Sequence, residues 1–475
     1  MQILRRTARP ALATESANFG FRAPALLVAT AQFMEGLDGT ILANALPYMA
    51  RDLGVAAVDL RLTITVYLVA VAVFVPLSPS LCNRFGATRV FRTAVGLFAM
   101  SSLACAASDS VPALVAARLV QGCAASMLLP LGRLLVLRDM PKHHLVTAIA
   151  VLTWPALLAP ILAPPLGGFL VQTLSWRWIF LINVPIGLAL YLLAPRVLPR
   201  NTKPSGRPLD LAGFALWALG ATALVGGLGE AAAQPALVSV ILAALVLIAG
   251  WAAVRHFRRT AHPLFDLSIL QIATFRHTQT GGSLVRIAIF ANPLLLPLMF
   301  QLGMGIAPVK AGFLVLVGML GNLAMKPLTT LVLKRFAYRP ILLVNGCVLT
   351  IGFALFTLID RSTPEELLIA LLIVTGMARS MHFTALNTLA FRDVPVAEME
   401  GANLMSSCSL QLNAALGAAM AVLALSAWPL IVPSATGEPA LPAFHFAFAA
   451  VAALVFLGTL EAMTLPTVRA IDRKT

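Results

Sequence analysis

The chain has 475 residues, of which 59% are hydrophobic and only 11% are charged, and its mean hydropathy is +0.90. Soluble proteins carry roughly 25% charged residues, so this composition excludes an ordinary soluble enzyme or binding module. A net charge of +15 would favour a nucleic-acid partner in a soluble protein, but the apolar runs here are long enough to cross a bilayer as helices. The composition predicts an all-α polytopic membrane protein, and we expect no nucleic-acid partner.

Apolar runs between polar breaks predict fourteen transmembrane helices. They cover residues 24–47, 60–80, 90–107, 113–137, 145–171, 178–195, 209–229, 236–254, 277–301, 310–333, 340–359, 366–391, 404–427 and 443–464. An even number of spans places both termini on one side. Most of the 34 Lys and Arg residues fall in loops on that side, which the positive-inside rule identifies as the cytoplasm.

A faint internal repeat divides the chain. The loop after the second predicted helix reads NRFGATR (Asn83 to Arg89), and the loop after the tenth reads KRFAYR (Lys334 to Arg339). If the two loops correspond, helices one to six match helices nine to fourteen, an arrangement typical of transporters with the working site between two halves. The predicted parts are a six-helix half at 1–195, a linker with two extra helices at 196–276, and a second six-helix half at 277–475.

The two extra helices are expected to be peripheral. Residues 209–254 contain carboxylates only near the ends of the predicted helices, at Asp210 and Glu230, and no basic residue before Arg255. Such helices can face lipid all round.

Two carboxylates, Glu35 and Asp38, lie three residues apart in the first predicted helix, so they share one face. An ionised carboxylate inside a bilayer costs about 2.5–3.5 kcal/mol even on the lenient insertion scale. A membrane protein therefore seldom keeps one unless it faces a partner or a water-filled path. Asp38 is the more central of the two; the alternative is that both reach the headgroups from near a helix end.

Arg118 and Gln121 share a face of the fourth predicted helix. Counted inward, Arg118 lies at about the depth of Asp38 in the outer half of the membrane. Because a buried arginine needs a carboxylate or several carbonyls, we predict an Asp38–Arg118 pair, direct or through water. The alternative is that Arg118 extends to the outer headgroups.

The fifth predicted helix contains the stretch WPALLAPILAPPLGG, from Trp154 to Gly168. Its prolines each remove a backbone donor, and its paired glycines permit close helix approach. This pattern is typical of a hinge in a rocking helix, and a merely kinked structural helix is the alternative. The residues concerned are Pro155, Pro160, Pro164, Pro165, Gly167 and Gly168.

Three cations, Arg286, Lys326 and Arg379, lie inside predicted helices nine, ten and twelve, and His382 follows one turn after Arg379. Glu461, near a helix end, is the one intramembrane acid in this half. A single such cation could hold carbonyls at a broken helix, whereas three indicate an anion or a watery cavity.

Other chemistry is not indicated. The five cysteines are scattered without a CxxC pair, so neither a disulfide framework nor a metal site is expected. The basic N-terminal stretch lacks the apolar core and small-residue cleavage site of a signal peptide. The sequence contains no GxxxxGK[ST] phosphate loop and no HExxH, so we predict a protein that is not an enzyme and needs no cofactor.

Together these stretches resemble the fourteen-helix drug/proton antiporters of the major facilitator superfamily. The resemblance rests on Phe33 to Pro47, ARLVQG at Ala117 to Gly122, APILAPPLGG at Ala159 to Gly168, and SWRWIFLINVPIG at Ser175 to Gly187. Gly132 to Pro141, Arg286 and Met325 to Leu328 resemble the MdtD-like subgroup of bacterial exporters.

The sequence departs from the family pattern in the loop at residues 79–89. Pro79 stands where the family has glycine, Asn83 stands where it has aspartate, and Ala87 and Thr88 replace a basic pair. The loop therefore keeps Arg84 without the acid that usually accompanies it. In the fifth helix, Ala163 also replaces a glycine of the family motif.

The resemblance implies a proton-coupled efflux transporter of drugs or other small amphipathic molecules, working by alternating access. It implies the major-facilitator fold in the bacterial inner (cytoplasmic) membrane, with both termini cytoplasmic and the proton gradient in place of a cofactor. The implied partners are a small-molecule substrate, protons and the lipid bilayer, and we expect a monomer.

The resemblance also implies roles for particular residues. Asp38 would bind the transported proton in exchange for substrate, with Glu35 as a second carboxylate near the cavity and Arg118 as its basic partner. The predicted substrate contacts are Glu35, Asp38, Gln121, Arg286 and Arg379. The predicted gating or hinge residues are Pro160, Pro164, Pro165, Gly167, Gly168 and Arg84.

Two alternatives remain open. The same scaffold could export an anionic metabolite, such as a di- or tricarboxylate or its metal complex, with the helical cations binding it. A non-transporting membrane receptor or membrane enzyme is the other class. A large soluble domain or a catalytic dyad would favour that class, and the sequence has neither.

Overall fold

The computed structural model describes residues 10–42, 45–55, 60–137, 145–198, 210–231, 235–395, 398–431 and 441–465. Every regular element within these ranges is a helix. In lipid each backbone donor and acceptor must be satisfied internally, and a helix does this within a single segment.

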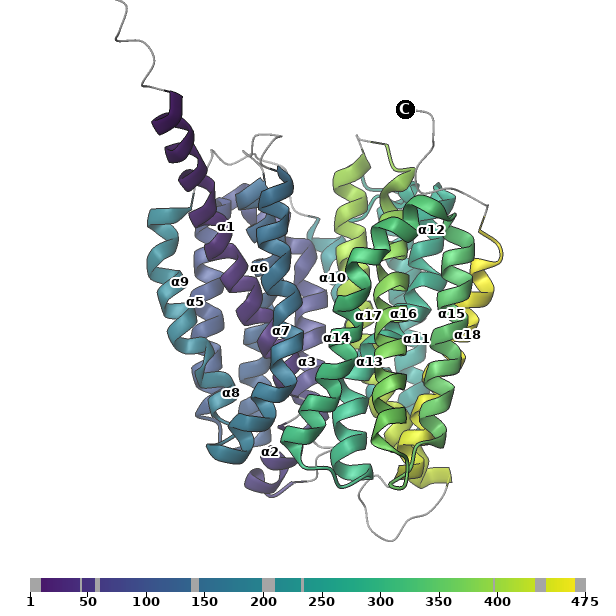
Figure 1. The fold of residues 1–475 in the computed structure, drawn as a ribbon. Coiled ribbons are helices and arrows are strands. Elements are labelled where there is room, and N and C mark those ends of the chain that lie inside the picture. Colours follow the sequence, from purple (N-terminus) through teal and green to yellow (C-terminus); the bar gives the residue numbers. More distant parts are fainter. Residues whose placement is uncertain are drawn as a thin grey trace, which may run out of the picture.

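The helices form two groups that stand side by side, with the first half on the left of Figure 1 and the second half on the right. The first half contains α1 (Pro10–Ile41), α2 (Leu46–Leu53), α3 (Arg61–Phe74), η2 (Val75–Leu77), α4 (Ser78–Phe85), α5 (Ala87–Ala106), α6 (Val111–Leu137), α7 (Leu145–Thr173), α8 (Trp178–Leu181) and α9 (Asn183–Val197).

Two helices and a short turn connect the halves: α10 (Leu211–Glu230), α11 (Ala236–Phe257) and η4 (Leu267–Gln271). The second half contains α12 (Ala273–Gln279), α13 (Gly281–Leu298), the π-helical turn η5 (Met299–Gly303), α14 (Pro308–Arg335), α15 (Tyr338–Leu355), η6 (Phe356–Leu358), α16 (Glu365–Arg392), α17 (Met399–Ile431) and α18 (Leu441–Ala462).

Eleven helical segments among the described residues are long and apolar enough to cross a membrane. The other three predicted ranges, 24–47, 90–107 and 145–171, coincide with α1, α5 and α7. All fourteen predicted ranges therefore fall on helices, and the all-α membrane class is confirmed. That all fourteen cross the membrane stays a prediction.

Prolines explain the main differences between predicted and observed boundaries. The first predicted helix was drawn to residue 47, but α1 ends at Ile41 and Pro47 lies in the first turn of the separate helix α2, where a missing backbone donor costs nothing. Pro76 lies in the 3₁₀ turn η2. By contrast, α7 runs as one helix through all four of its prolines.

The expectation that both extra helices face lipid all round is wrong for α10. Val225 of α10 is fully buried with Ala415 and Ala419 of α17, and Leu68 of α3 packs against the same cluster. The Trp217 indole N–H donates to the carbonyl of Ala72 at 3.3 Å. One face of α10 thus packs on both halves, whereas α11 is exposed along most of its length.

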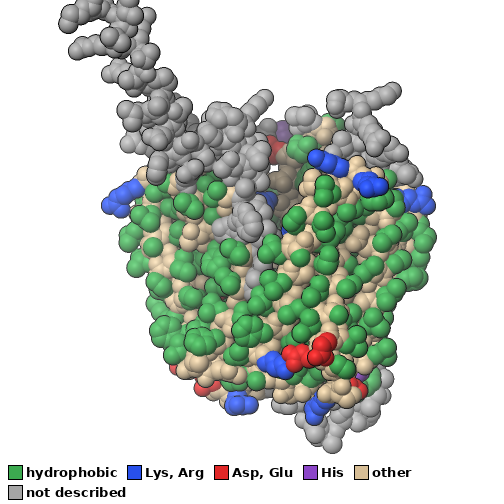
Figure 2. Space-filling model, viewed as in Figure 1, with side chains coloured by type: hydrophobic (Ala, Val, Ile, Leu, Met, Phe, Trp, Pro, Cys, Tyr) green, Lys and Arg blue, Asp and Glu red, His purple; other side chains and the backbone are tan. Residues whose placement is uncertain are grey.

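The two ends of the molecule differ in charge and in closure. We call the end with exposed Arg84, Arg196, Arg258 and Arg335 the basic end, and the end with Asp52, Asp109, Asp360 and Glu365 the opposite end. Figure 2 shows hydrophobic side chains covering the visible face between these ends, as a membrane-embedded surface requires, and a hollow between the halves at the basic end.

The halves meet near the opposite end, where α7 crosses α14 (Figure 1). A Cβ atom added to Gly168 would lie 2.7 Å from the Pro308 carbonyl oxygen, and one added to Gly312 would lie 2.5 Å from the Pro164 carbonyl oxygen. Backbone therefore lies against backbone at this crossing. The molecule is closed at the opposite end and open at the basic end.

Candidate functional site

The predicted ion pair between Asp38 and Arg118 is present and direct. An Arg118 guanidinium nitrogen lies 2.6 Å from Asp38 Oδ2, and each residue is 1% exposed. Arg118 therefore does not extend to the headgroups, which was the alternative. Four helices bring in the partners of this pair: α3, α6, α8 and α9.

Both oxygens of Asp38 accept hydrogen bonds. Besides the bond to Oδ2, the Gln121 amide donates to Oδ1 at 3.0 Å and the Asn183 amide donates to Oδ1 at 2.8 Å. Gln121 also donates to the Ser102 hydroxyl at 2.7 Å and accepts from Arg118 at 2.7 Å. The four side chains around Asp38 form one buried, connected network.

Arg118 is further held by aromatic rings and a carbonyl. Its guanidinium carbon lies 4.1 Å from the ring centre of Tyr67 and 5.7 Å from that of Phe180, within the range of cation–π attraction. Its Nε–H donates to the Thr63 carbonyl at 3.3 Å. A charge pair so enclosed tolerates the loss of either partner poorly.

The expectation that Asp38 is more central than Glu35 is wrong. Asp38 lies three residues before Ile41, where α1 ends, so Glu35 is the carboxylate farther from this end of the helix. Asp38 is buried because α1 packs against α6, α7 and α9. The helices packed around Asp38, rather than its depth in the lipid, therefore isolate this carboxylate from water.

Glu35 has a different environment, although it shares a face of α1 with Asp38. It is half-buried, and it makes no hydrogen bond or ion pair with any residue that the structure describes. Two buried polar atoms nearby in the first half, Gln32 Nε2 and the Tyr67 hydroxyl, also have no partner among the described residues. The two predicted coupling carboxylates thus have opposite surroundings.

Asn183 and Ser102 are parts of the site that sequence reasoning missed. Asn183 is the first residue of α9, and Ser102 lies on α5; both are fully buried. A polar residue inside the apolar stretch Trp178 to Gly187 was the available signal for Asn183. Ser102 offered no comparable signal, because a serine bonds readily to its own helix.

Arg286 in the second half fits the structural role that the sequence left open. It is 2% exposed and donates to the Thr278 carbonyl at 3.0 Å and to the Asn387 side-chain oxygen at 3.1 Å. Thr280, with φ −99° and ψ −94°, separates α12 from α13. The arginine thus binds a carbonyl that this helix break releases.

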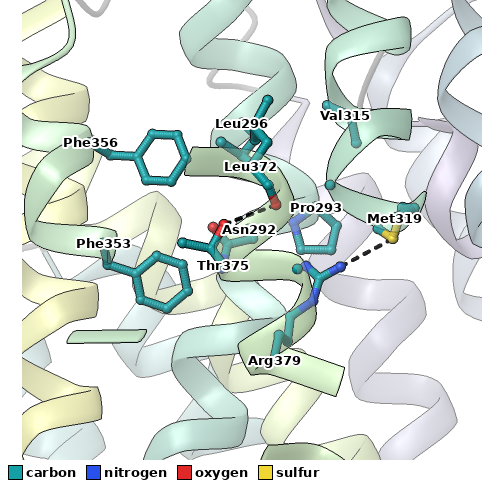
Figure 3. Close-up of a pocket in the computed structure, with 12 residues that line it drawn as sticks. Asn292, Pro293, Leu296, Val315, Met319, Phe353, Phe356, Leu372, Thr375 and Arg379 are labelled. Carbon is teal, nitrogen blue, oxygen red and sulfur yellow. Dashed lines mark hydrogen bonds between the residues drawn. The ribbon is translucent and has the colours of Figure 1, made fainter. Parts of the chain in front are cut away.

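Arg379 lies beside a small cavity between α13, α14 and α16, shown in Figure 3. The cavity holds about 20 Å³, which is room for one water. The Arg379 guanidinium donates to the Met319 sulfur at 3.1 Å, a weak acceptor. Asn292, which is 2% exposed, lines the same cavity, and its side-chain oxygen has no hydrogen-bond partner among the residues that the structure describes.

The two arginines have different partners in the structure, and their role as substrate contacts stays a prediction. Arg379 and Asn387, the partner of Arg286, are eight residues apart on α16, or about 12 Å along the helix. The third helical cation, Lys326, donates to the Thr384 hydroxyl at 3.2 Å. No acid among the described residues pairs with any of the three.

The predicted hinge residues lie at the crossing of the two halves. Pro164, Pro165 and Gly168 contact α14 directly, and Gly167 is buried beside them. Pro160 lies within α7, but its side chain is outside the described set. Arg84 is far from this crossing, exposed at the basic end, with its guanidinium carbon 5.5 Å from the Phe85 ring centre.

A polar cluster at the opposite end joins three segments of the first half. Arg177 pairs with Asp52 at 2.6 Å and with Asp109 at 3.1 Å, and the Trp176 indole N–H donates to Asp52 at 2.8 Å. The hydrogen bonds from Trp176 and Arg177 hold the pKa of Asp52 below its usual value. This cluster ties α2 to the turns before α6 and α8.

The cluster predicts a small acid-dependent loss of stability. A lowered pKa stabilises the fold above the unfolded-state pKa, about 3.9, and this contribution disappears as pH falls through the folded-state pKa. We expect Asp52→Asn to lower the melting temperature at neutral pH but not at an acidic pH below the folded-state pKa of Asp52. Because Asp52 is half exposed, solvent screening keeps the effect small, and thermal melts across pH measure it. Equal destabilisation at both pH values would contradict this assignment.

These features define a class of protein. Two helical halves meet at one end and leave a hollow at the other, and the first half holds a buried charge pair inside an apolar bundle. Such an arrangement is that of a membrane transporter. The sequence model of the Major Facilitator Superfamily matches residues 28–418, and the chain belongs to this superfamily.

Relatives of known name agree with this placement. The chain is 35% identical over 401 residues to a protein of Pectobacterium carotovorum (strain PC1) that is named for multidrug resistance, MdtD, covering 84% of this chain and 86% of that protein. A protein of Serratia proteamaculans with the same name is 34% identical over 449 residues, covering 93% and 92%. The resemblance to the MdtD-like subgroup is confirmed.

Solved structures show the same fold. The inward-open xylose transporter XylE from E. coli matches with a TM-score of 0.63 at 14% identity, covering 96% of this chain and 98% of that one. A D-xylose-proton symporter matches with a TM-score of 0.67 at 13% identity, covering 95% and 99%. The protein is therefore a multi-pass membrane transporter with the major-facilitator fold, and it is not an enzyme.

Proposed function

We propose that this protein is a proton-coupled efflux transporter that exports drugs or other small amphipathic molecules across the bacterial inner membrane. The observation that carries the proposal is the buried Asp38–Arg118 network beside Glu35, a half-buried carboxylate with no described partner. Ionisable groups inside a membrane bundle mark proton or substrate paths. The multidrug-resistance names of the relatives support the substrate class.

The proposed orientation follows from charge. With the basic end in the cytoplasm, as the positive-inside rule favours, the hollow opens to the cytoplasm and receives substrate there. Opening at the opposite end then releases the substrate and admits a proton. A proton moving down the membrane potential supplies about 2.3 kcal/mol per 100 mV, enough for modest uphill export.

The test uses purified protein in liposomes with an imposed pH gradient. We expect the lipophilic cation ethidium to accumulate only when the lumen is acidic, and a protonophore to abolish this accumulation. Liposomes without protein are the control for passive leak. Ethidium transport at the same rate with and without the gradient would contradict proton coupling.

A second candidate function is export of an anionic metabolite, such as a di- or tricarboxylate or its metal complex. It is favoured by Arg379, a half-buried cation whose one described hydrogen bond goes to a sulfur atom, and by the unpaired Asn292 oxygen in the same cavity. A carboxylate within 6 Å of such a cation gains about 2–3 kcal/mol at an effective dielectric near 20.

This candidate predicts different results for the two arginines. Arg379→Gln should lower citrate transport about tenfold or more while sparing ethidium, because the lost attraction exceeds the 1.4 kcal/mol that corresponds to a factor of ten. Arg286→Gln should impair both substrates, because it removes a structural bond to Thr278. Parallel uptake of citrate and ethidium measures this. Equal losses of both substrates in Arg379→Gln would contradict the anion function.

A further inference from the structure

We propose that the exchangeable proton resides on Glu35, and that Asp38 stays ionised within its ion pair. The inference rests on the proposed proton coupling and names the group that performs it. It reverses the roles that the sequence suggested for these two carboxylates.

Three donors hold Asp38 in its ionised form. Arg118 donates to Oδ2 at 2.6 Å, and Gln121 and Asn183 donate to Oδ1 at 3.0 and 2.8 Å. A proton on Asp38 would leave the charge of Arg118 buried beside a neutral acid, which is costly. Hydrogen bonds from donors stabilise the ionised form, so Asp38 is the fixed anion of the site.

Glu35 can gain and lose a proton without breaking any contact to a described residue. It is half-buried and lies one helical turn from Asp38 on the same face. The titratable groups that interact with it electrostatically are Asp38 on its own helix and Tyr67 on α3. Four helices pack on α1. Of these, α7 and α8 carry no ionisable residue, α6 carries Arg118, Cys123 and Arg133, and α9 carries Tyr191 and Arg196.

Two unpaired donors flank Glu35. Gln32, three residues earlier on the same face and 3% exposed, has an unpartnered side-chain nitrogen. Tyr67 lies within electrostatic reach of Glu35, and its buried hydroxyl has no hydrogen-bond partner within the described part of the chain. Buried polar atoms without partners are rare in native proteins and imply water or an alternative conformation.

This assignment explains how proton and substrate exclude each other. An ionised Glu35 attracts a cationic group, whereas a protonated Glu35 does not. The Asp38–Arg118 pair stays neutral overall in both states, so the net charge of the site changes only at Glu35. Competition for one carboxylate then couples export of a cation to import of a proton.

The test locates the proton directly and needs no substrate. Infrared difference spectra of the reconstituted protein, recorded between about pH 9 and pH 5.5, report protonated carboxyl groups while exposed carboxylates, with pKa values near 4, stay ionised. We expect a carboxylic-acid carbonyl band in the wild type and in the double variant Asp38→Asn with Arg118→Gln, which leaves no unpaired buried charge, and its loss in Glu35→Gln. Glu35→Asp should restore a band at a shifted position.

The same spectra can also contradict the placement of the proton on Glu35. A band that persists in Glu35→Gln and disappears in the double variant Asp38→Asn with Arg118→Gln would overturn the assignment, and so would the absence of a pH-dependent band from the wild type. The ethidium assay separates this inference from the proposed function. A Glu35 band together with gradient-independent ethidium transport would contradict proton coupling while leaving the protonation site in place.

Discussion

Replacement of Arg118 by glutamine is expected to destabilise the folded transporter by about 3–5 kcal/mol. The variant leaves Asp38 as a buried anion whose remaining donors are the neutral amides of Gln121 and Asn183. Asp38 is 1% exposed, and these neutral amides do not replace the counter-charge that a buried carboxylate needs. Thermal unfolding of the purified protein in detergent measures the loss, and we expect ethidium transport to be lost with it.

Two further variants test whether the lost stability comes from an unpaired buried charge or merely from replacing an arginine side chain. The double variant Asp38→Asn with Arg118→Gln removes both charges and should recover most of the lost stability, because no unpaired ion remains. Arg177→Gln is the matched control, since Arg177 pairs with Asp52 and Asp109 at an exposed position, where ion pairs contribute about 1 kcal/mol or less. If Arg118→Gln costs no more than Arg177→Gln, the buried pair is not a structural requirement.

The sequence was sufficient to predict the Asp38–Arg118 pair because the physics of the membrane leaves few choices. A buried arginine needs an anion, and few acids other than Asp38 lie at the depth of Arg118 in the first half. The helix ranges followed from the length of the apolar runs for the same reason, since each run must span a bilayer of fixed thickness. The ion pair and the helix ranges were therefore predicted correctly because, in each case, a single physical constraint left few alternatives.

The sequence was insufficient where the answer depends on how helices rotate and pack. In the sequence, Arg286 and Arg379 are both single basic residues within apolar runs. In the structure, Arg286 binds a carbonyl released at a helix break, whereas Arg379 lines a small cavity. The buried face of α10 is likewise made of Val225 and small neighbours, a composition equally suited to lipid. Hydropathy cannot tell a protein partner from a lipid chain.

The crossing of α7 and α14 predicts a second large effect, on the conformation of the transporter. Gly312→Val would place a Cβ atom 2.5 Å from the Pro164 carbonyl oxygen, and backbone at that distance cannot move aside without separating the helices. We therefore expect this variant to shift the protein away from the state closed at the opposite end, and to lose most ethidium transport.

Spin labels on the two halves measure this shift as a distance. Ser110 of the first half and Glu366 of the second are both exposed at the opposite end, so cysteines there can carry labels once the cysteines that are not buried are replaced by serine. Those are Cys82, Cys123 and Cys347. We expect a longer distance distribution in Gly312→Val than in the wild type.

The matched control is Gly226→Val on α10, where an added Cβ atom meets nothing within 4 Å. It makes the same change of residue in a transmembrane helix without a clash, so the distance distribution should stay that of the wild type. If Gly312→Val also leaves the distribution unchanged, the α7–α14 crossing accommodates a side chain, and the closure of the two halves does not depend on backbone contact. If both variants lengthen the distance, the effect comes from valine in a helix rather than from the crossing.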